Sequence, residues 1–431
     1  MINKMMANTV IDGDYKGFPN NAPATALDQF ASLKWNLLAQ DLPFPVAILK
    51  NSAMEHNSRW MRNFVEKSGA FLCPHGKTTM SPQLFQKQLE DGAWGITVAT
   101  VDQMKICRNY GISPLLLANQ LIGRQSIEYV LNEMQRDPEF EFYCLVDSVK
   151  GVETLASAAR QKNLGSPIRV MMEIGFSGGR TGCRTLQSAM EVASAVHRAV
   201  PFLQLTGIEC FEGLMSGEQE VRTKKVRDLL KFLVEVAEKC AENQLFDSDP
   251  IILSAGGSAY YDLVLAQLSQ ANLPLDVKVL IRSGCYLTHD SAFYQTYFEE
   301  ILTRSETARK LGEGFRPALE VWALVQSMPE PGLALVTMGK RDVSFDAELP
   351  KPLKWFRADQ TAVPEKLGEE YAITALNDQH GYMKVPQNCP LQIGDLICFG
   401  ISHPCTTFDR WQLIYVVDDH YNVISGIKTF F

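Results

Sequence analysis

The segment 71–82, FLCPHGKTTMSP, places a lysine directly after a short apolar run. Gly76-Lys77-Thr78 could end a nucleotide-binding P-loop, but that loop needs a glycine five residues before Gly76. Phe71 stands there instead, and a bulky residue that favours β structure does not open a phosphate-wrapping turn. We therefore reject a P-loop. Lys77 is instead interpreted as an amine at the carboxyl end of a predicted strand, which Pro74 terminates.

A second chemically active pair lies in GISHPCTTFDRW, residues 400–411, where His403 and Cys405 are two positions apart. On an extended strand such residues point to the same face, so we expect an imidazole and a thiolate that form half of a zinc site. A structural zinc would normally need two further protein ligands, so we interpret the pair as an open, catalytic site. The spacing alone fits a core cysteine beside a hydrogen-bonded histidine equally well.

Three glycine-rich segments follow predicted strands: MEIGFSGGRTGC at 172–183, SAGGSAYYD at 254–262 and IRSGCYLTHD at 281–290. Their glycines do not have the G-x-G-x-x-G spacing of a dinucleotide-binding fold. Loops of this composition expose backbone N–H groups, and barrels commonly use the loops after strands seven and eight to bind phosphate. The first segment also carries Arg180, for which an exposed surface position is the alternative.

The elements that must position these residues are apolar runs separated by amphipathic stretches. Eight runs are predicted as strands: 70–73, 95–99, 114–118, 141–146, 168–174, 205–210, 250–255 and 277–282. Segments such as MSPQLFQKQLEDG between them have apolar residues at three- and four-residue steps, which is typical of helices. Near-continuous apolar strands alternating with helices indicate a parallel sheet buried on both faces, and eight units predict a (β/α)₈ barrel, the TIM barrel fold.

The pattern changes after about residue 305, where strands such as ALEVWALVQSMP and GDLICFG are broken by Pro, Gly and Asp-rich turns. This predicts a second, mainly antiparallel β domain. The run FPVAILK at 44–50 is one strand too many for the barrel, so we assign it to this β domain. The expected organisation is a barrel over 52–304, and a β domain made of 1–51 together with 305–431.

Composition excludes several classes of function. The net charge of −8 comes from dispersed acidic residues, and without a basic cluster nucleic acid is not an expected partner. No stretch approaches the ~20 apolar residues of a membrane span, and the first residues lack an apolar core of signal-peptide length, so no membrane association and a cytoplasmic protein are expected. The ten cysteines are scattered through apolar segments, and we expect no disulfide framework.

A barrel with a lysine after its first strand, followed by a β domain, resembles the fold-type III pyridoxal phosphate enzymes of the alanine racemase superfamily, in particular its D-threonine aldolase and D-serine dehydratase branch. CPHGKTTMSP is similar to the family's Pro-His-x-Lys-Thr segment. The resemblance implies that Lys77 forms the Schiff base with the cofactor. It also implies that His75 orients the loop or contacts the cofactor, with a packed histidine as the alternative.

The GGRTGC segment resembles a family segment that ends in Asn-Arg-Thr-Gly, which implies that Arg180 approaches the cofactor ring oxygen. The chain departs from that pattern with Gly175 and Gly179 in place of polar residues. The two later glycine segments resemble the family's phosphate-binding loops. They imply a phosphate cup followed by a tyrosine that lines the pocket: Gly256, Gly257, Ser258, Gly284 and Cys285 for the cup, and Tyr286 for the lining.

The same resemblance implies a metal, preferably zinc, at His403 and Cys405, because the β domain of this family carries His-x-Cys in its dehydratases and His-x-Asp in its aldolases. The expected activity is therefore dehydration of a D-β-hydroxy amino acid such as D-serine or D-threonine, to a 2-oxo acid and ammonia. An aldolase-type C–C lyase, a noncatalytic pyridoxal phosphate-binding protein and a racemase are the alternatives. The β domain and the metal pair argue against the last two, and a homodimer is expected.

Overall fold

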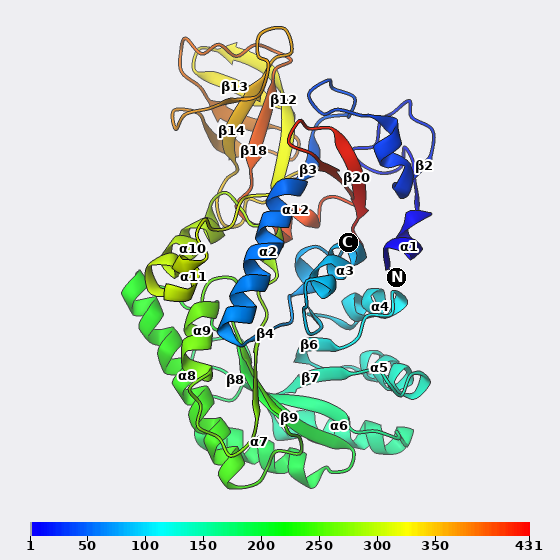
Figure 1. The fold of residues 1–431 in the computed structure, drawn as a ribbon, viewed down its shortest axis with the longest axis vertical. Helices are drawn as coiled ribbons and strands as arrows, with labels where there is room; N and C mark the ends of the chain where they lie inside the picture. Colours follow the sequence, from blue (N-terminus) through cyan, green and yellow to red (C-terminus); the bar gives the residue numbers. More distant parts are fainter. Residues whose placement is uncertain (1) are drawn as a thin grey trace.

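The computed structural model describes residues 2–431, and an eight-stranded parallel sheet forms its larger half (Figure 1). The strand order is β4-β11-β10-β9-β8-β7-β6-β5. The ring closes between β4 and β5, because Trp94 N–H donates to Leu72 O at 2.7 Å and Thr97 N–H donates to Pro74 O at 3.0 Å. All eight predicted strands are confirmed, and with them the barrel: β4 Phe71–Leu72, β5 Ile96–Val98, β6 Leu115–Gln120, β7 Phe142–Val146, β8 Ile168–Ile174, β9 Leu203–Cys210, β10 Ile251–Ala255 and β11 Val277–Ile281.

Helices cover the outside of the sheet, and a separate buried cluster fills its interior. The outer helices are α2 Asn51–Ser68, α3 Pro82–Glu90, α4 Val101–Asn109, α5 Arg124–Arg136, α6 Val149–Lys162, α7 Leu186–Arg198, α8 Gln219–Glu242, α9 Tyr261–Leu268, α10 Phe293–Arg304 and α11 Glu306–Lys310. Hydroxyl side chains accept backbone N–H groups at the starts of four of them; these capping residues are Thr100, Ser148, Thr185 and Ser305. The interior cluster consists of Cys73, Leu116, Tyr143, Leu145, Met171, Ile252 and Leu280.

The second sheet has ten strands and forms the other half of the molecule. Its pairs are antiparallel except β3 with β19, which are parallel. The run at 44–50 forms β3 and pairs with β12 as well as β19. The strands are β3 Val46–Lys50, β12 Leu319–Glu330, β13 Leu333–Val336, β14 Lys351–Phe356, β15 Glu365–Lys366, β16 Ala372–Leu376, β17 Gly381–Lys384, β18 Leu396–Gly400, β19 Leu413–Val417 and β20 Val423–Lys428.

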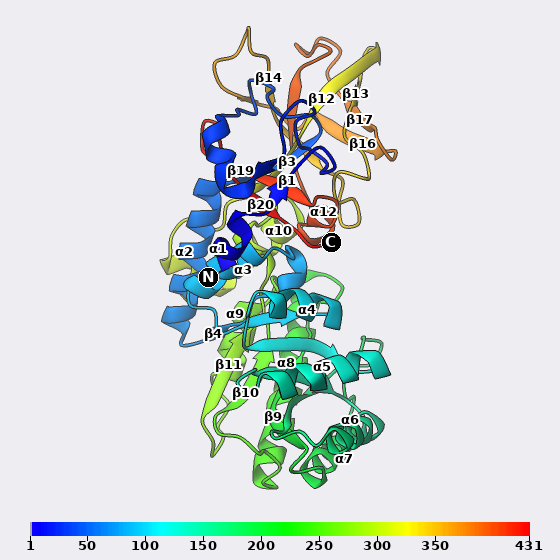
Figure 2. The ribbon, with the colours of Figure 1, turned by 90° about the vertical axis from the view of Figure 1, so that its right-hand side faces the viewer.

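The short elements lie at the beginning of the chain and at the junction of the two halves. They are α1 Ile2–Ala7, β1 Val10–Ile11, β2 Thr25–Ala26, the 3₁₀ turns Leu27–Leu33, Gly76–Thr78 and Cys285–Leu287, and α12 Cys405–Phe408. Figures 1 and 2 both place α12 between the barrel and the ten-stranded sheet. Both ends of the described chain lie near this junction as well.

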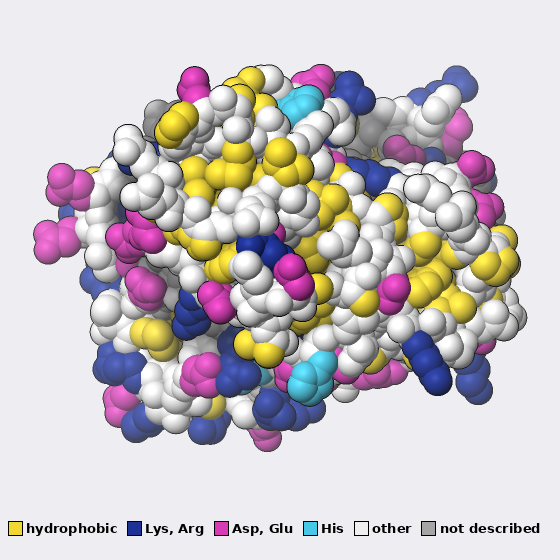
Figure 3. Space-filling view, turned by 90° about the horizontal axis from the view of Figure 1, so that it is seen from above, with side chains coloured by type: hydrophobic (Ala, Val, Ile, Leu, Met, Phe, Trp, Pro, Cys, Tyr) yellow, Lys and Arg dark blue, Asp and Glu magenta, His cyan; other side chains and the backbone are white. Residues whose placement is uncertain are grey.

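The outer surface mixes charges of both signs. Seen from above the second sheet (Figure 3), basic and acidic side chains alternate around apolar ones, without a broad basic area on this face. In the described part of the chain, no helix has the length and apolar character that crossing a bilayer requires.

Candidate active site

The loop of Lys77 is held against the barrel rim by neighbouring strands. Cys73 N–H donates to Ile281 O at 2.8 Å, and the chain then turns through the 3₁₀ turn Gly76–Thr78. Gly76 suits this turn because a Cβ there would lie 2.9 Å from the Ile96 side chain, too close for any larger residue without repacking. The local sequence thus fixes Lys77 at the mouth of the barrel, as predicted.

Lys77 lies in a cleft made of two adjoining cavities. One, of about 110 Å³, is lined by Lys77 together with Thr78, Cys285 and Cys405 among others. The other, of about 60 Å³, includes Lys77 and Arg180. Five residues line both cavities, which makes them parts of one cleft: His75, Lys77, Phe211, Gly257 and Arg282. A larger hollow of about 970 Å³ lies between α5 and α6, and none of the predicted site residues lines it.

The cleft carries several positive charges. Lys77, Arg180 and Arg282 line it, and Arg282 is buried and ion-paired with Glu209. His75 lies among these cations, and burial, followed by the charges of Lys77, Arg282 and Arg180, holds its pKa well below the ordinary value. His75 is therefore a neutral imidazole, and the cleft as a whole attracts an anionic ligand.

The predicted phosphate cup is only partly as expected. Gly257, Ser258 and Gly284 line the cavity. Gly256 does not, because its N–H and that of Gly257 donate to the fully buried Glu212 carboxylate, at 3.2 and 2.8 Å. A buried carboxylate requires such donors, so Glu212 takes two amides that the sequence suggested for phosphate, and the prediction for Gly256 is corrected.

The 3₁₀ turn Cys285–Leu287 separates two other predicted residues. Successive side chains in a 3₁₀ helix point about 120° apart. Cys285 faces the cavity, whereas the ring of Tyr286 is buried and packs against Phe315. The expectation that Tyr286 lines the pocket is therefore wrong for its side chain.

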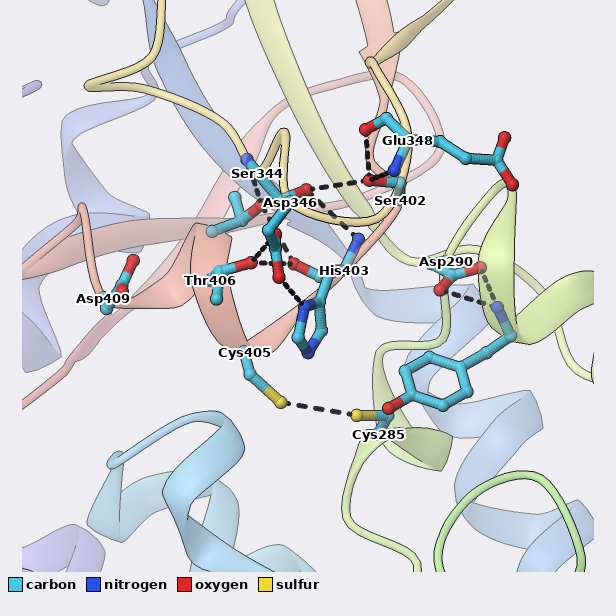
Figure 4. Close-up of polar contacts among 12 residues, drawn as sticks. Cys285, Asp290, Ser344, Asp346, Glu348, Ser402, His403, Cys405, Thr406 and Asp409 are labelled. Atoms are coloured by element: carbon cyan, nitrogen blue, oxygen red, sulfur yellow. Dashed lines mark hydrogen bonds and ion pairs between the residues drawn. The ribbon is translucent and has the colours of Figure 1, made fainter. Parts of the chain in front are cut away.

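His403 and Cys405 do not lie on a strand, contrary to the expectation from their spacing. β18 ends at Gly400, and Pro404 has helical backbone angles and precedes α12, of which Cys405 is the first residue. Figure 4 nevertheless shows both side chains pointing to the same region, near Cys285. The Cys405 Sγ lies 3.6 Å from the Cys285 Sγ and 3.4 Å from Thr78 Oγ1, so the β half closes over the Lys77 loop.

Asp346 holds the His403 ring from behind. His403 Nδ1 lies 2.6 Å from Asp346 Oδ2, and Thr406 Oγ1 donates to Asp346 Oδ1 at 2.6 Å (Figure 4). Burial would lower the pKa of His403, but the hydrogen bonds and charges of Cys405 and Asp346 outweigh it and raise that pKa to about 9. The pKa of Cys405 is held well below its ordinary value, first by Cys285 and then by His403. A cation that displaces the Nε2 proton would bind an imidazole already oriented through Nδ1, beside a thiolate.

Several residues of the site were missed by the sequence analysis. Arg282 and Glu209 look like ordinary strand ends, and Asp346 lies in a loop far from His403 in the chain. Tyr294, at the start of α10, also lines the cavity with Cys405. For Arg282, the signal that could have been used is a charged residue directly after the apolar run VKVLI.

The residues present fit a phosphorylated aldehyde cofactor and a metal ion. The buried Nδ1 of His75 has no hydrogen-bond partner within the described residues. A Cβ at Gly284 would lie 2.5 Å from His75 O, so only glycine leaves the close approach of these two loops open. Within residues 2–431, no group of three or more His, Cys, Asp or Glu side chains is arranged to hold a metal.

Comparison with known proteins gives the same assignment. The alanine racemase N-terminal domain matches residues 49–291, and a serine dehydratase domain matches residues 318–417. The 3-hydroxy-D-aspartate aldolase of Paracoccus denitrificans (strain Pd 1222) is 25% identical over 348 residues, which cover 80% of this chain and 83% of that protein.

Solved structures support the fold. The structure of D-threonine aldolase from Filomicrobium marinum has a TM-score of 0.72 at 19% identity, covering 90% of this chain and 95% of that one. The structure of D-threo-3-hydroxyaspartate dehydratase from Delftia sp. HT23 has a TM-score of 0.70 at 18% identity, covering 92% and 99%. Since the first domain match spans more than half of the sequence, the chain belongs to the alanine racemase N-terminal domain family, within the fold-type III pyridoxal phosphate enzymes.

Proposed function

We propose that this protein is a pyridoxal phosphate- and metal-dependent dehydratase of D-β-hydroxy amino acids such as D-serine or D-threonine, which it converts to a 2-oxo acid and ammonia. The observation that carries the proposal is that Lys77 and Cys405 line the same cavity. The relatives support the reaction class, because their names describe lyases of D-hydroxy amino acids: aldolases of D-threonine and 3-hydroxy-D-aspartate, and a dehydratase of D-threo-3-hydroxyaspartate.

The barrel residues would hold the cofactor. Lys77 would bind it covalently, Arg180 would lie near its ring oxygen, and Ser258 and Gly284 would receive its phosphate. When bound, the cofactor withdraws electrons from Cα of the substrate and the metal acts as a Lewis acid toward the β-hydroxyl. Lys77 Nζ would be the base that accepts the Cα proton. Neutral His75 adds no further positive charge beside this lysine.

The junction residues would hold the metal. His403 and Cys405 supply one nitrogen and one sulfur, and a thiolate favours zinc over magnesium or manganese. Variants of a D-threo-3-hydroxyaspartate dehydratase in which a histidine, or the cysteine two residues after it, is replaced by alanine have been solved, the latter in a metal-free form. The spacing is that of His403 and Cys405.

An aldolase that splits Cα–Cβ is the second candidate. It is favoured by three sequence relatives that align with most of the chain, all of which are named as aldolases. Cys405 favours the dehydratase. By the resemblance, dehydratases of this branch carry His-x-Cys at this place, whereas its aldolases carry His-x-Asp. A dehydratase releases 2-oxo acid and ammonia, whereas an aldolase releases an aldehyde and a smaller amino acid.

The experiment is a panel of D-serine, D-threonine and 3-hydroxy-D-aspartate, assayed separately for 2-oxo acid and for aldehyde with the metal-loaded protein. We expect 2-oxo acid. Borohydride reduction should fix the cofactor on the wild type and leave none on Lys77→Ala, whereas Cys405→Ala should still trap cofactor but release no product. Cys389→Ala, at a half-exposed cysteine outside the cleft, is the control and should match the wild type. Aldehyde as the main product would replace the dehydratase by the aldolase.

We also propose that the protein is a cytoplasmic homodimer. All ten cysteines are free, which suits a reducing compartment. Sedimentation at micromolar concentration tests the dimer, and a single monomeric species would remove it.

A further inference from the structure

Two thiols of the cleft face each other across the junction of the two halves. The Sγ atoms of Cys285 and Cys405 lie 3.6 Å apart, and both residues line the cavity that contains Lys77 (Figure 4). In residues 2–431 this is the one pair of cysteine sulfurs in hydrogen-bonding contact. The two are 120 positions apart in the sequence, so the fold alone brings them together.

We propose that Cys285 and Cys405 are a site of reversible oxidation that closes to a disulfide. A disulfide bond is about 2.05 Å long, so the sulfurs must approach each other by about 1.5 Å. Both cysteines lie in short elements, Cys285 in a three-residue 3₁₀ turn and Cys405 at the start of a four-residue helix. Neither belongs to a strand, so the approach breaks no sheet ladder. Thr78 Oγ1 lies 3.4 Å from one sulfur and 3.7 Å from the other, and its hydroxyl is free to rotate.

The chemistry needs a two-electron oxidant, for which hydrogen peroxide is the simplest. One thiol loses its proton, and the thiolate attacks a peroxide oxygen. The O–O bond breaks, a sulfenic acid forms, and the hydroxide that is released combines with the lost proton to give water. The second thiol also loses its proton, and its thiolate attacks the sulfenic sulfur. The S–S bond forms, and the sulfenic hydroxyl leaves with that proton as a second water. Two thiols are oxidised and one peroxide is reduced to two waters. A dithiol reductant reverses the reaction by exchange.

The consequence for activity depends on the proposed function. Cys405 in a disulfide has no thiolate to give a metal, so disulfide and bound metal exclude each other. The bond would also link the barrel covalently to the β half across the cleft that admits the substrate. The site would therefore switch between a metal-loaded reduced form and a metal-free oxidised form.

Cys389 is an internal control for the pair Cys285 and Cys405. Cys389 is the other cysteine that is not buried, and it lies outside the cleft without a sulfur in contact in the described residues. The remaining eight, Cys285 included, are buried, and of these only Cys285 lines the cavity. Peroxide should therefore link Cys285 to Cys405 and leave Cys389 unlinked within the chain.

The experiment treats the full-length protein with hydrogen peroxide, after chelation and again with excess zinc, and then maps alkylated peptides by mass spectrometry. We expect a linked peptide pair containing Cys285 and Cys405, with two hydrogens lost, that dithiothreitol separates. At a zinc concentration of about 100 times the dissociation constant, only about 1% of chains are metal-free, so linkage should slow by about 100-fold. Cys285→Ser should abolish the linked pair, and Cys389→Ser should leave it unchanged.

The outcomes separate this inference from the proposed function. Peptides of Cys285 and Cys405 that remain unlinked in the oxidised wild type overturn it, and this readout does not depend on how Cys285→Ser folds. A linked pair that forms equally fast with and without zinc supports the oxidation site but removes Cys405 as a metal ligand. Absence of lyase activity on every substrate tested refutes the proposed function and leaves the disulfide readout untouched.

Discussion

Replacing Asp346 by asparagine should weaken metal binding at His403 and Cys405. The Asp346 carboxylate accepts the Nδ1–H of His403 at 2.6 Å and the hydroxyl of Thr406 at 2.6 Å, which orients the ring through Nδ1 and leaves Nε2 as the nitrogen that would bind a metal. The asparagine side chain is neutral, so it would not increase the basicity of the imidazole. It has a single acceptor oxygen, so it could not accept hydrogen bonds from both His403 and Thr406 in the way the carboxylate does.

The size of the effect follows from the position of Asp346. Loss of such a partner typically weakens metal affinity 10- to 100-fold, which is about 1.4 to 2.7 kcal/mol. The side chain of Asp346 is 46% exposed, so water can replace part of the lost hydrogen bonding. We therefore expect an increase of about tenfold in the dissociation constant for zinc, at the lower end of this range.

The assay is competition for zinc against a chromophoric chelator at fixed pH. Asp409→Asn is the matched control. Asp409 lies in the segment 400–411 that also contains His403, its side chain is 42% exposed, and it pairs with Arg410 rather than with His403. It should bind zinc like the wild type. Equal affinities for the Asp346 variant and the wild type, or equal losses in both variants, would show that Asp346 does not act through His403.

Two further predictions concern the barrel mouth. In Gly284→Ala the new Cβ would lie 2.5 Å from His75 O, so the variant should lose about 1 to 3 kcal/mol of unfolding free energy and bind the cofactor more weakly, whereas Gly165→Ala, with open space around it, should do neither; urea unfolding and cofactor titration decide this. Burial raises the pKa of Glu209 to about 7, against the charge of Arg282. Folded Glu209 therefore holds its proton more tightly than Glu209 of the unfolded chain does. Its contribution to the unfolding free energy of the wild type falls as the pH rises from the ordinary pKa of 4.5 to about 7. Glutamine does not titrate, so the unfolding free energy of Glu209→Gln relative to wild type should rise by about 2 to 3 kcal/mol between about pH 5 and about pH 8, and a difference that does not change with pH would be contrary to this reasoning.

The barrel could be predicted from the sequence because most of its strands are buried on both faces. Such strands read as continuous apolar runs, and the eight runs coincide with β4 to β11. Lys77 was predictable for the same reason, since its place follows directly from the end of one run. Local pattern therefore sufficed wherever position depended on one element.

Local pattern failed where a turn changed the direction of a side chain. The assignment of His403 and Cys405 to a strand overlooked Pro404, which cannot donate to a ladder and instead leads into α12. Tyr286 was misplaced by a 3₁₀ turn that only three residues form. The contact between Cys285 and Cys405 had no local signal at all.

The reactive groups are divided between the two halves, so their spacing depends on how the halves are joined. Three backbone hydrogen bonds cross the junction next to these groups: Phe430 N–H to Met80 O at 3.0 Å, Ser291 N–H to Ile401 O at 3.0 Å, and Ala318 N–H to Thr288 O at 2.8 Å. Met80 lies three residues after Lys77, and Ile401 two residues before His403. Each group is thus oriented by its own turn, whereas the distance between them is set by the junction, because these bonds tie the two turns into one packed unit.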